Sequence, residues 1–180
     1  MSIYAKEVNK YLVGLQNGDI TQFKPLYESM QTHIMGVARY YLVDKSYCED
    51  VTSEVFQKIF LYVNSSYTEG TDGYNWICRI TENVAYNYNN RMPPPVKDLD
   101  KAEHFVQELA VSDDTEEKLD LFRAIDSLEP DSREIIYLRY FMGNTFQEIG
   151  EKLHISKVAV KKKIDKILSR LKIFIETGKR

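Results

Sequence analysis

The sequence predicts an all-α protein made of two small helical domains, joined by an acidic, proline-containing linker, with a helix-turn-helix in the C-terminal domain. Apolar residues recur at three- and four-residue spacing through most of the chain, whereas the alternating pattern of strands is almost absent. Pro93, Pro94 and Pro95 interrupt this pattern, because proline lacks a backbone N–H and cannot continue a helix. We therefore expect one domain at 1–91, a linker at 92–114 and a second domain at 115–180.

Apolar stripes and end signals predict the helices of the first domain. Asn17-Gly18 is typical of a helix C-terminus, because glycine adopts the left-handed conformation at little cost. Asp19 with Gln22, and Ser46 with Glu49, have the spacing of N-terminal capping boxes. The predicted helices cover 4–15, 19–41, 46–63 and 74–91, and a loop rich in Ser, Thr, Asn, Asp and Gly covers 64–73.

The second domain has clear signals for the starts and ends of its helices. Pro130 indicates a helix start, Gly143-Asn144 indicates a turn, and Thr145 with Glu148 forms a third candidate capping box. The helices predicted there cover 116–127, 131–142, 145–153 and 156–175, and a weaker helical pattern occupies 100–109 in the linker.

Composition argues against catalysis and against membrane insertion. No apolar run approaches the ~18 residues that cross a bilayer, and Lys6, Glu7 and Lys10 stand where a signal peptide needs an apolar core. Cys48 and Cys78 have no partner at zinc-ligand spacing, so we expect buried thiols. No catalytic motif or phosphate loop is present. We expect a cytoplasmic protein that is not an enzyme and uses no cofactor, metal or small-molecule substrate.

Charge is distributed very unevenly along the chain. The net charge is −3, yet the last thirty residues hold 10 Lys or Arg against 3 Asp or Glu, a net +7. Residues 96–117 hold 2 against 8, a net −6. A basic end on an acidic protein indicates a local site for a polyanion rather than a generally adhesive surface.

The basic end coincides with a predicted helix-turn-helix at 145–175. Val160, Ile164 and Ile167 lie on one face of its second helix, so the basic residues lie on the other. Phosphates attract lysine through counterion release, and an apolar side chain at the start of such a helix can contact a thymine methyl group. The candidate DNA contacts are Ser156, Lys157, Val158, Lys161, Lys162, Lys163 and Lys166. A solvated basic face on an ordinary helical hairpin is the alternative.

The segment "LEPDSREIIYLRYFMGNTFQEIGEKLHISKVAVKKKIDKILSRLK" resembles region four of bacterial sigma factors, the domain that binds the upstream promoter element. Gly150 replaces the common alanine, His154 the common turn glycine and Ala159 the common threonine. His154 suits its place, because histidine adopts left-handed backbone conformations more readily than most other residues. Lys163 replaces a frequent arginine, which keeps the charge but loses the two-pronged geometry.

The N-terminal half resembles sigma region two over "GDITQFKPLYESM", "CEDVTSEVF" and "NWICRITENVAYNYNNR". This order of domains, with only a short linker between them, is characteristic of the extracytoplasmic-function (ECF) group. The resemblance implies a sigma factor that binds core RNA polymerase and promoter DNA, and commonly also an anti-sigma factor. It further implies that Asp50, Glu54 and Phe56 contact the polymerase.

The resemblance also assigns the downstream promoter element to the N-terminal domain. Its last helix and the preceding loop would hold unstacked bases against aromatic rings and in a pocket. The candidate contacts are Arg79, Asn83, Asn87 and Arg91, with Tyr67 and Tyr74 as stacking rings. Core packing is the more favoured interpretation of Trp76 and Tyr88. The acidic linker would pass near the RNA exit path, or serve as a solvated tether.

Two other classes of protein fit the sequence. A stand-alone helix-turn-helix regulator would use the N-terminal domain for oligomerisation or sensing and would bind its operator without polymerase. An inactive sigma-like decoy would titrate polymerase, and the few basic residues between Arg79 and Arg91 favour it.

Overall fold

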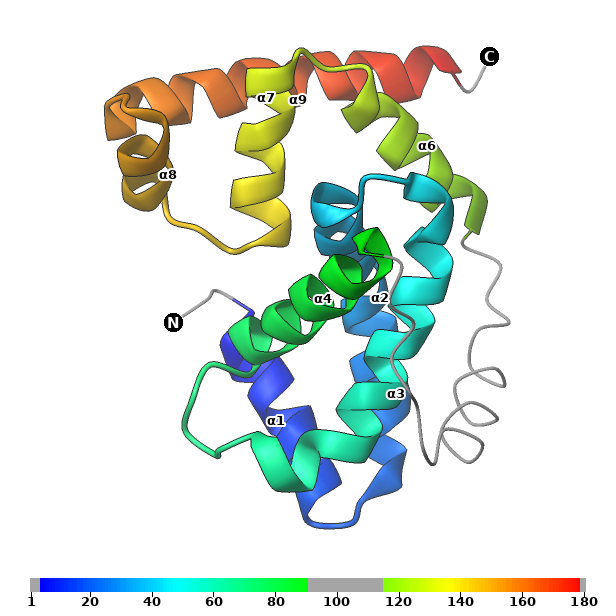
Figure 1. The fold of residues 1–180 in the computed structure, drawn as a ribbon. Coiled ribbons are helices and arrows are strands. Elements are labelled where there is room, and N and C mark those ends of the chain that lie inside the picture. The colour runs from blue at the N-terminus through cyan, green and yellow to red at the C-terminus, as the bar shows by residue number, and fades with distance from the viewer. Residues whose placement is uncertain (1–3, 91–114, 179–180) are drawn as a thin grey trace. The chain divides into compact units, whose positions relative to one another are not determined.

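The computed structural model describes residues 4–90 and 115–178, and every regular element in these two ranges is helical. The all-α prediction is therefore confirmed for this part of the chain. The chain divides into two compact units, 1–111 and 112–180 (Figure 1). The predicted linker, its weak helical pattern at 100–109 and Arg91 lie outside the described residues. No helix among the described residues is both long enough and apolar enough to cross a membrane.

The N-terminal unit holds four helices, each close to its predicted position. They are α1 (Ala5–Gln16), α2 (Phe23–Tyr41), α3 (Cys48–Ser66) and α4 (Gly73–Asn89). Gly18 adopts a φ of 82° just after α1, as expected for a glycine that ends a helix. The predicted loop between α3 and α4 is shorter than expected, because α3 continues to Ser66.

Neither capping box predicted in this unit forms. The Asp19 carboxylate accepts a hydrogen bond from Thr21 N at 3.1 Å, and the Gln22 side chain donates to that same carboxylate instead of serving the backbone. Farther along, Asp44 accepts from Ser46 N at 2.9 Å. In both places an aspartate satisfies the backbone two residues ahead. The result is a short 3-10 turn before α2 and another before α3.

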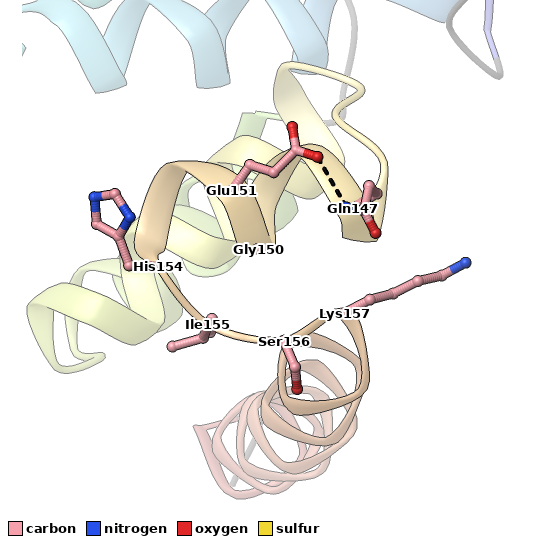
Figure 2. A pocket seen from close by; sticks show the side chains of 7 residues that line it. All are labelled: Gln147, Gly150, Glu151, His154, Ile155, Ser156 and Lys157. Atoms are coloured by element: carbon pink, nitrogen blue, oxygen red, sulfur yellow. Dashed lines mark hydrogen bonds between the residues drawn. The ribbon is translucent and has the colours of Figure 1, made fainter.

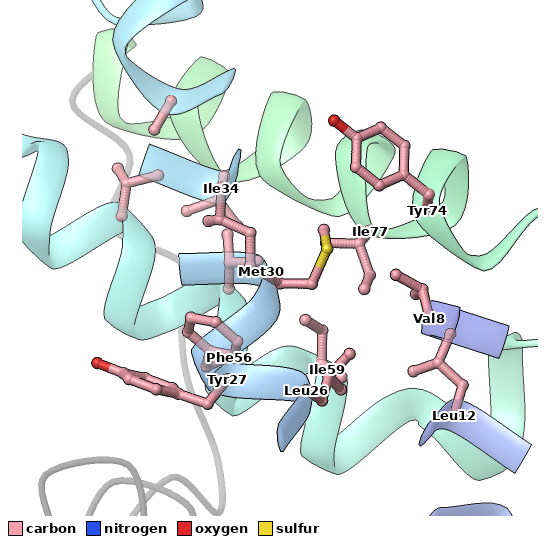
Figure 3. Close-up of a cluster of buried hydrophobic side chains, with 14 of the residues drawn as sticks. Val8, Leu12, Leu26, Tyr27, Met30, Ile34, Phe56, Ile59, Tyr74 and Ile77 are labelled. Atoms are coloured by element: carbon pink, nitrogen blue, oxygen red, sulfur yellow. The ribbon is translucent and has the colours of Figure 1, made fainter. Parts of the chain in front are cut away.

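The four helices enclose one apolar core (Figure 3). Helices α2, α3 and α4 pack on one another, and α1 packs against all three. The side chains of the predicted stripes line this core, although several of them are only half-buried, namely Tyr41, Phe60, Trp76, Ile80 and Tyr88. Trp76 and Tyr88 pack partly buried against the core, in agreement with the interpretation of both as packing residues. The side chains labelled in the close-up are Val8, Leu12, Leu26, Tyr27, Met30, Ile34, Phe56, Ile59, Tyr74 and Ile77.

The two thiols lie in this core region, Cys48 buried and Cys78 half-buried. Burial raises the pKa of Cys48 to about 11 and that of Cys78 to about 12, because an apolar environment disfavours the thiolate. We expect both thiols of the native protein to react with iodoacetamide at pH 8 about a hundredfold or more slowly than an exposed cysteine. Labelling followed by mass spectrometry, with the urea-unfolded chain as control, checks this. Equal rates in both states would contradict the burial.

The same pKa shifts determine whether the stability of the fold rises or falls with pH. The folded state holds these protons more tightly than the unfolded chain, whose cysteines titrate near a pKa of about 8.5. The neutral thiols therefore contribute fully to the free energy of unfolding at pH values below the pKa of the unfolded cysteines. This contribution is lost as the pH rises toward the folded pKa values of about 11 and 12.

The C-terminal unit holds α6 (Thr115–Asp126), α7 (Pro130–Ile136), α8 (Phe146–Leu153) and α9 (Lys157–Gly178). A π-helical turn, Tyr137–Phe141, extends α7. Helix α9 packs against the other three helices, and the core beneath it is apolar. The side chains that form this core include Phe122, Ile125, Ile135, Leu138, Ile149, Val160, Ile164 and Ile167.

Arg133 closes the end of α6 from within α7. Its guanidinium donates to Asp126 O at 2.7 Å and to Leu128 O at 3.0 Å, which supplies partners to carbonyls that the helix end leaves unpaired. Arg133→Met keeps the apolar stem and removes both bonds, so we expect a loss of about 1.5–3 kcal/mol of unfolding free energy. Urea unfolding measures this loss. Arg123→Met is the control, because the Arg123 side chain is exposed and pairs with Asp120 on the surface; equal losses in both variants would contradict the capping role.

Candidate nucleic-acid interface

Helices α8 and α9 form the predicted helix-turn-helix, and its local signals are all present. Thr145 Oγ1 accepts from Glu148 N at 3.3 Å while Glu148 Oε2 accepts from Thr145 N at 2.6 Å, so this capping box is complete. These bonds hold the pKa of Glu148 below its usual value. His154 ends α8 in the left-handed conformation, with φ 55° and ψ 39°. Ser156 Oγ accepts from Ala159 N at 3.1 Å and caps the start of α9.

Gly150 allows the turn to approach α8 closely. A Cβ atom at this position would lie 2.6 Å from Ile155 O, which is closer than real contacts allow. Ile155 N in turn donates to Gly150 O at 2.9 Å. The glycine that replaces the common alanine of the family thus has a structural reason in this chain, since the turn backbone occupies the space of a methyl group.

The predicted DNA-contacting residues of α9 all lie on the exposed surface of the domain. Val158, near the start of the helix, is 63% exposed. The buried positions Val160, Ile164 and Ile167 face α6, α7 and α8, so the lysines face away from the domain core. Among the described residues, none of these lysines forms an ion pair, and their charges are available to phosphate. The exposed set is Ser156, Lys157, Val158, Lys161, Lys162, Lys163 and Lys166.

A surface hollow of about 630 Å³ lies beside the turn, lined by α8 and the start of α9 (Figure 2). Gln147 Nε2 donates to Glu151 Oε1 at 2.8 Å along one wall. Ser156 and Lys157 form the opposite wall, where the first N–H groups of α9 favour an anion. The concave turn therefore adjoins the basic face of α9.

Helix α4 presents a second polar face, in the N-terminal unit. Arg79 and Asn83 are exposed and Asn87 is half-buried, so two of the predicted downstream contacts are fully accessible. Tyr86 is 66% exposed and lies on the same face, three residues after Asn83. Sequence reasoning missed this ring. The signal was present, since Tyr86 falls off the apolar stripe that contains Val84 and Ile77.

The two tyrosines predicted to stack on bases lie in the core instead. Tyr74 is 0% exposed and Tyr67 is 4% exposed. The Tyr74 ring lies 5.1 Å from that of Tyr4, and the Tyr67 ring lies 5.5 Å from that of Trp76. Burial raises the pKa of both phenols. Neither ring presents a face to solvent, so the structure does not support a stacking role for them.

The three predicted polymerase contacts of α3 differ in accessibility. Asp50 is exposed in the first turn of the helix. Glu54 is buried and pairs with Lys58 at 3.4 Å. Phe56 is 0% exposed, and its ring lies 4.4 Å from that of Tyr27. Of these three residues, only Asp50 can contact a partner without a rearrangement, because the other two side chains are buried.

No group of three or more His, Cys, Asp or Glu side chains that could hold a metal ion occurs among the described residues. A capped helix-turn-helix with an exposed basic second helix is typical of DNA-binding domains of the helix-turn-helix class. Residues 124–172 match the family model of sigma-70, region 4. This segment is therefore similar to region 4 of sigma-70 proteins.

Known proteins show the same likeness. The RNA polymerase sigma-F factor of Bacillus subtilis (strain 168) is 39% identical over 67 residues, which are 35% of this chain and 26% of that protein. The chain thus matches about a quarter of the length of this relative.

Solved structures of low sequence identity also resemble the chain. CnrH, solved in complex with the cytosolic domain of CnrY, is 16% identical with a TM-score of 0.46, over 94% of this chain and 97% of that one. A chain of the RsbN–BldN complex is 19% identical with a TM-score of 0.39, over 89% and 96%.

Proposed function

We propose that this protein is a sigma factor of the ECF group, which binds core RNA polymerase, directs it to promoters and catalyses no reaction itself. The observation that carries the proposal is the exposed lysine face of α9 within the segment that matches sigma-70, region 4. Such a protein acts in the cytoplasm, where polymerase and promoter DNA are located. An anti-sigma factor is a further partner that the family resemblance implies.

The two units divide promoter recognition between them in this proposal. Ser156 and Val158 at the start of α9 reach base edges of the upstream element, and the lysines that follow contact its phosphates. In the N-terminal unit, Arg79 and Asn83 contact the downstream element as it opens. Asp50 contributes to polymerase docking from the first turn of α3.

Tyr86 is the exposed ring on the α4 face and is best placed to stack on an unpaired base. Alanine substitution of a stacking ring costs roughly 1–3 kcal/mol per base, so Tyr86→Ala is expected to lower open-complex formation about fivefold or more. Tyr86→Phe keeps the aromatic ring, so this variant is expected to retain normal open-complex formation. Permanganate footprinting of unpaired thymines in the holoenzyme–promoter complex measures the difference. If the alanine and phenylalanine variants open DNA equally well, Tyr86 is not a stacking residue.

The experiment that tests the proposed function is run-off transcription from a genomic fragment library, with purified bacterial core polymerase and the full-length protein. New start sites that share two spaced upstream motifs are expected. No new start sites, despite direct DNA binding by the protein alone, would support the stand-alone regulator. Inhibition of transcription driven by another sigma factor, again without new start sites, would support the decoy.

A further inference from the structure

The loop at 67–72, between α3 and α4, is held in place by two amide side chains of α1, with which it lies side by side (Figure 1). Asn9 Nδ2 donates to Thr71 O at 2.8 Å, and Asn9 Oδ1 accepts from Gly73 N at 2.8 Å. Gln16 Nε2 donates to Val63 O and to Tyr67 O, both at 2.9 Å. Four hydrogen bonds to backbone groups thus fix both ends of the loop from a single helix.

Gly73 shows how closely the loop and α1 fit together. A Cβ atom at this position would lie 2.6 Å from Asn9 Oδ1 and 2.6 Å from Leu12 Cδ1. Asp72 caps α4 by accepting from Asn75 N at 3.1 Å, so the loop leads directly into the helix that carries Arg79. The position of α1 therefore sets the position of the loop relative to the exposed face of α4.

The tip of the loop is exposed and has a defined shape. Thr71 N donates to Thr68 O at 3.1 Å, and the Thr71 hydroxyl donates to the same carbonyl at 2.7 Å. Gly70 sits between them with a φ of 87°, a conformation that favours glycine. Thr68, Glu69 and Thr71 are exposed around this turn. The tip carries a carboxylate and no cation, so it suits amino groups on base edges rather than phosphates.

We infer that Asn9 and Gln16 are positioning residues, which hold the loop at 67–72 in the shape that lets its tip read an unpaired base of the downstream promoter element beside α4. This inference rests on the proposed sigma function. Neither amide contacts DNA; each acts through the loop backbone. A loop without these bonds keeps its sequence but samples several shapes, so discrimination between bases falls while the lysine face of α9, in the other unit, is unchanged.

The test uses the full chain with core polymerase and two promoter libraries, one randomised in the downstream element and one in the upstream element. Asn9→Ala and Gln16→Ala are each expected to lower the preference for favoured downstream sequences about fivefold, the factor that corresponds to roughly 1 kcal/mol for lost hydrogen bonding. Gln16→Glu, equal in size but unable to donate, is expected to lower it at least as much. Preference at the upstream element is expected to stay unchanged in all three variants.

Asn64→Ala is the matched control, because Asn64 is an exposed amide at the end of α3 and the positioning bonds do not use it. Thermal unfolding of each variant identifies any that fails to fold. Unchanged downstream preference in folded Asn9 and Gln16 variants, or an equal loss at both elements, would overturn the inference and leave the sigma function standing. A wild-type chain that produces no start site with core polymerase would overturn the proposed function and the inference together.

Discussion

Replacing Lys161, Lys162 and Lys166 with alanine is expected to weaken binding of the holoenzyme to the upstream promoter element on the order of a hundredfold at 0.1 M salt. The three side chains are exposed on the face of α9 opposite its buried stripe, and none forms an ion pair among the described residues. Each lysine that neutralises a phosphate releases condensed counterions. Loss of three contacts should therefore make the slope of log affinity against log salt shallower by roughly 2.7.

The measurement is a salt titration of holoenzyme binding to a labelled upstream-element duplex. Lys6, Lys10 and Lys24, changed together to alanine, provide the control, because all three are exposed in the N-terminal unit and carry the same total charge. A charge effect that depends only on the net charge would lower affinity equally in both triple variants. An unchanged slope in the α9 variant would refute the placement of these lysines on DNA.

The salt slope also separates the roles of Lys162 and Val158. A lysine that contacts phosphate weakens binding to all sequences alike, whereas a side chain on a base edge changes preference at one position. Val158→Ala is an apolar truncation on a 63% exposed side chain. This substitution should leave the slope of log affinity against log salt nearly unchanged. It should measurably lower the preference for thymine at one position of the upstream element.

The helices were predictable because their signals are local. Each buried stripe is a property of spacing within one segment, and the capping box at Thr145 needs only the residue three positions ahead, Glu148. The left-handed turn at His154 follows in the same way. Elements defined within about ten residues of sequence could therefore be placed to within a few residues of their observed ends.

The capping boxes expected at Asp19 and Ser46 fail for an instructive reason. Each sequence fits the template, but an aspartate carboxylate accepts from the backbone N–H two residues ahead instead, Asp19 from Thr21 and Asp44 from Ser46. The competition produces a 3-10 turn and delays the helix start. Short-range patterns of this kind do not state which of two local hydrogen bonds is the stronger.

Site residues were harder to predict, because exposure depends on which helices meet. The family motif points to Tyr67 and Tyr74, but whether a ring faces DNA or the core depends on α1 and on Tyr4, far away in the sequence. The same packing leaves Tyr86 exposed. The amides Asn9 and Gln16 gave no signal at all, since their partners are backbone groups 47 to 64 residues away in the chain.

Phe56→Ala is expected to lower the unfolding free energy by about 3–5 kcal/mol, a cost typical of removing a buried phenylalanine ring. The ring is 0% exposed and packs against Tyr27, with Phe23 at 6.1 Å between ring centroids. Since whole domains are stable by only about 5–15 kcal/mol, this loss can unfold the N-terminal unit. Urea unfolding measures it, and a loss below about 1 kcal/mol would contradict the core position.

Asp50→Asn provides the contrast that separates folding from docking. Asp50 is exposed, and its charge stabilises the N-terminal end of α3 by no more than about 1 kcal/mol. We expect this variant to fold and to bind core polymerase more weakly. Phe56→Leu, which refills much of the cavity, should restore stability and polymerase binding together. If Phe56→Leu were stable but deficient in binding, the ring itself would have to contact polymerase, and α3 would have to open for docking.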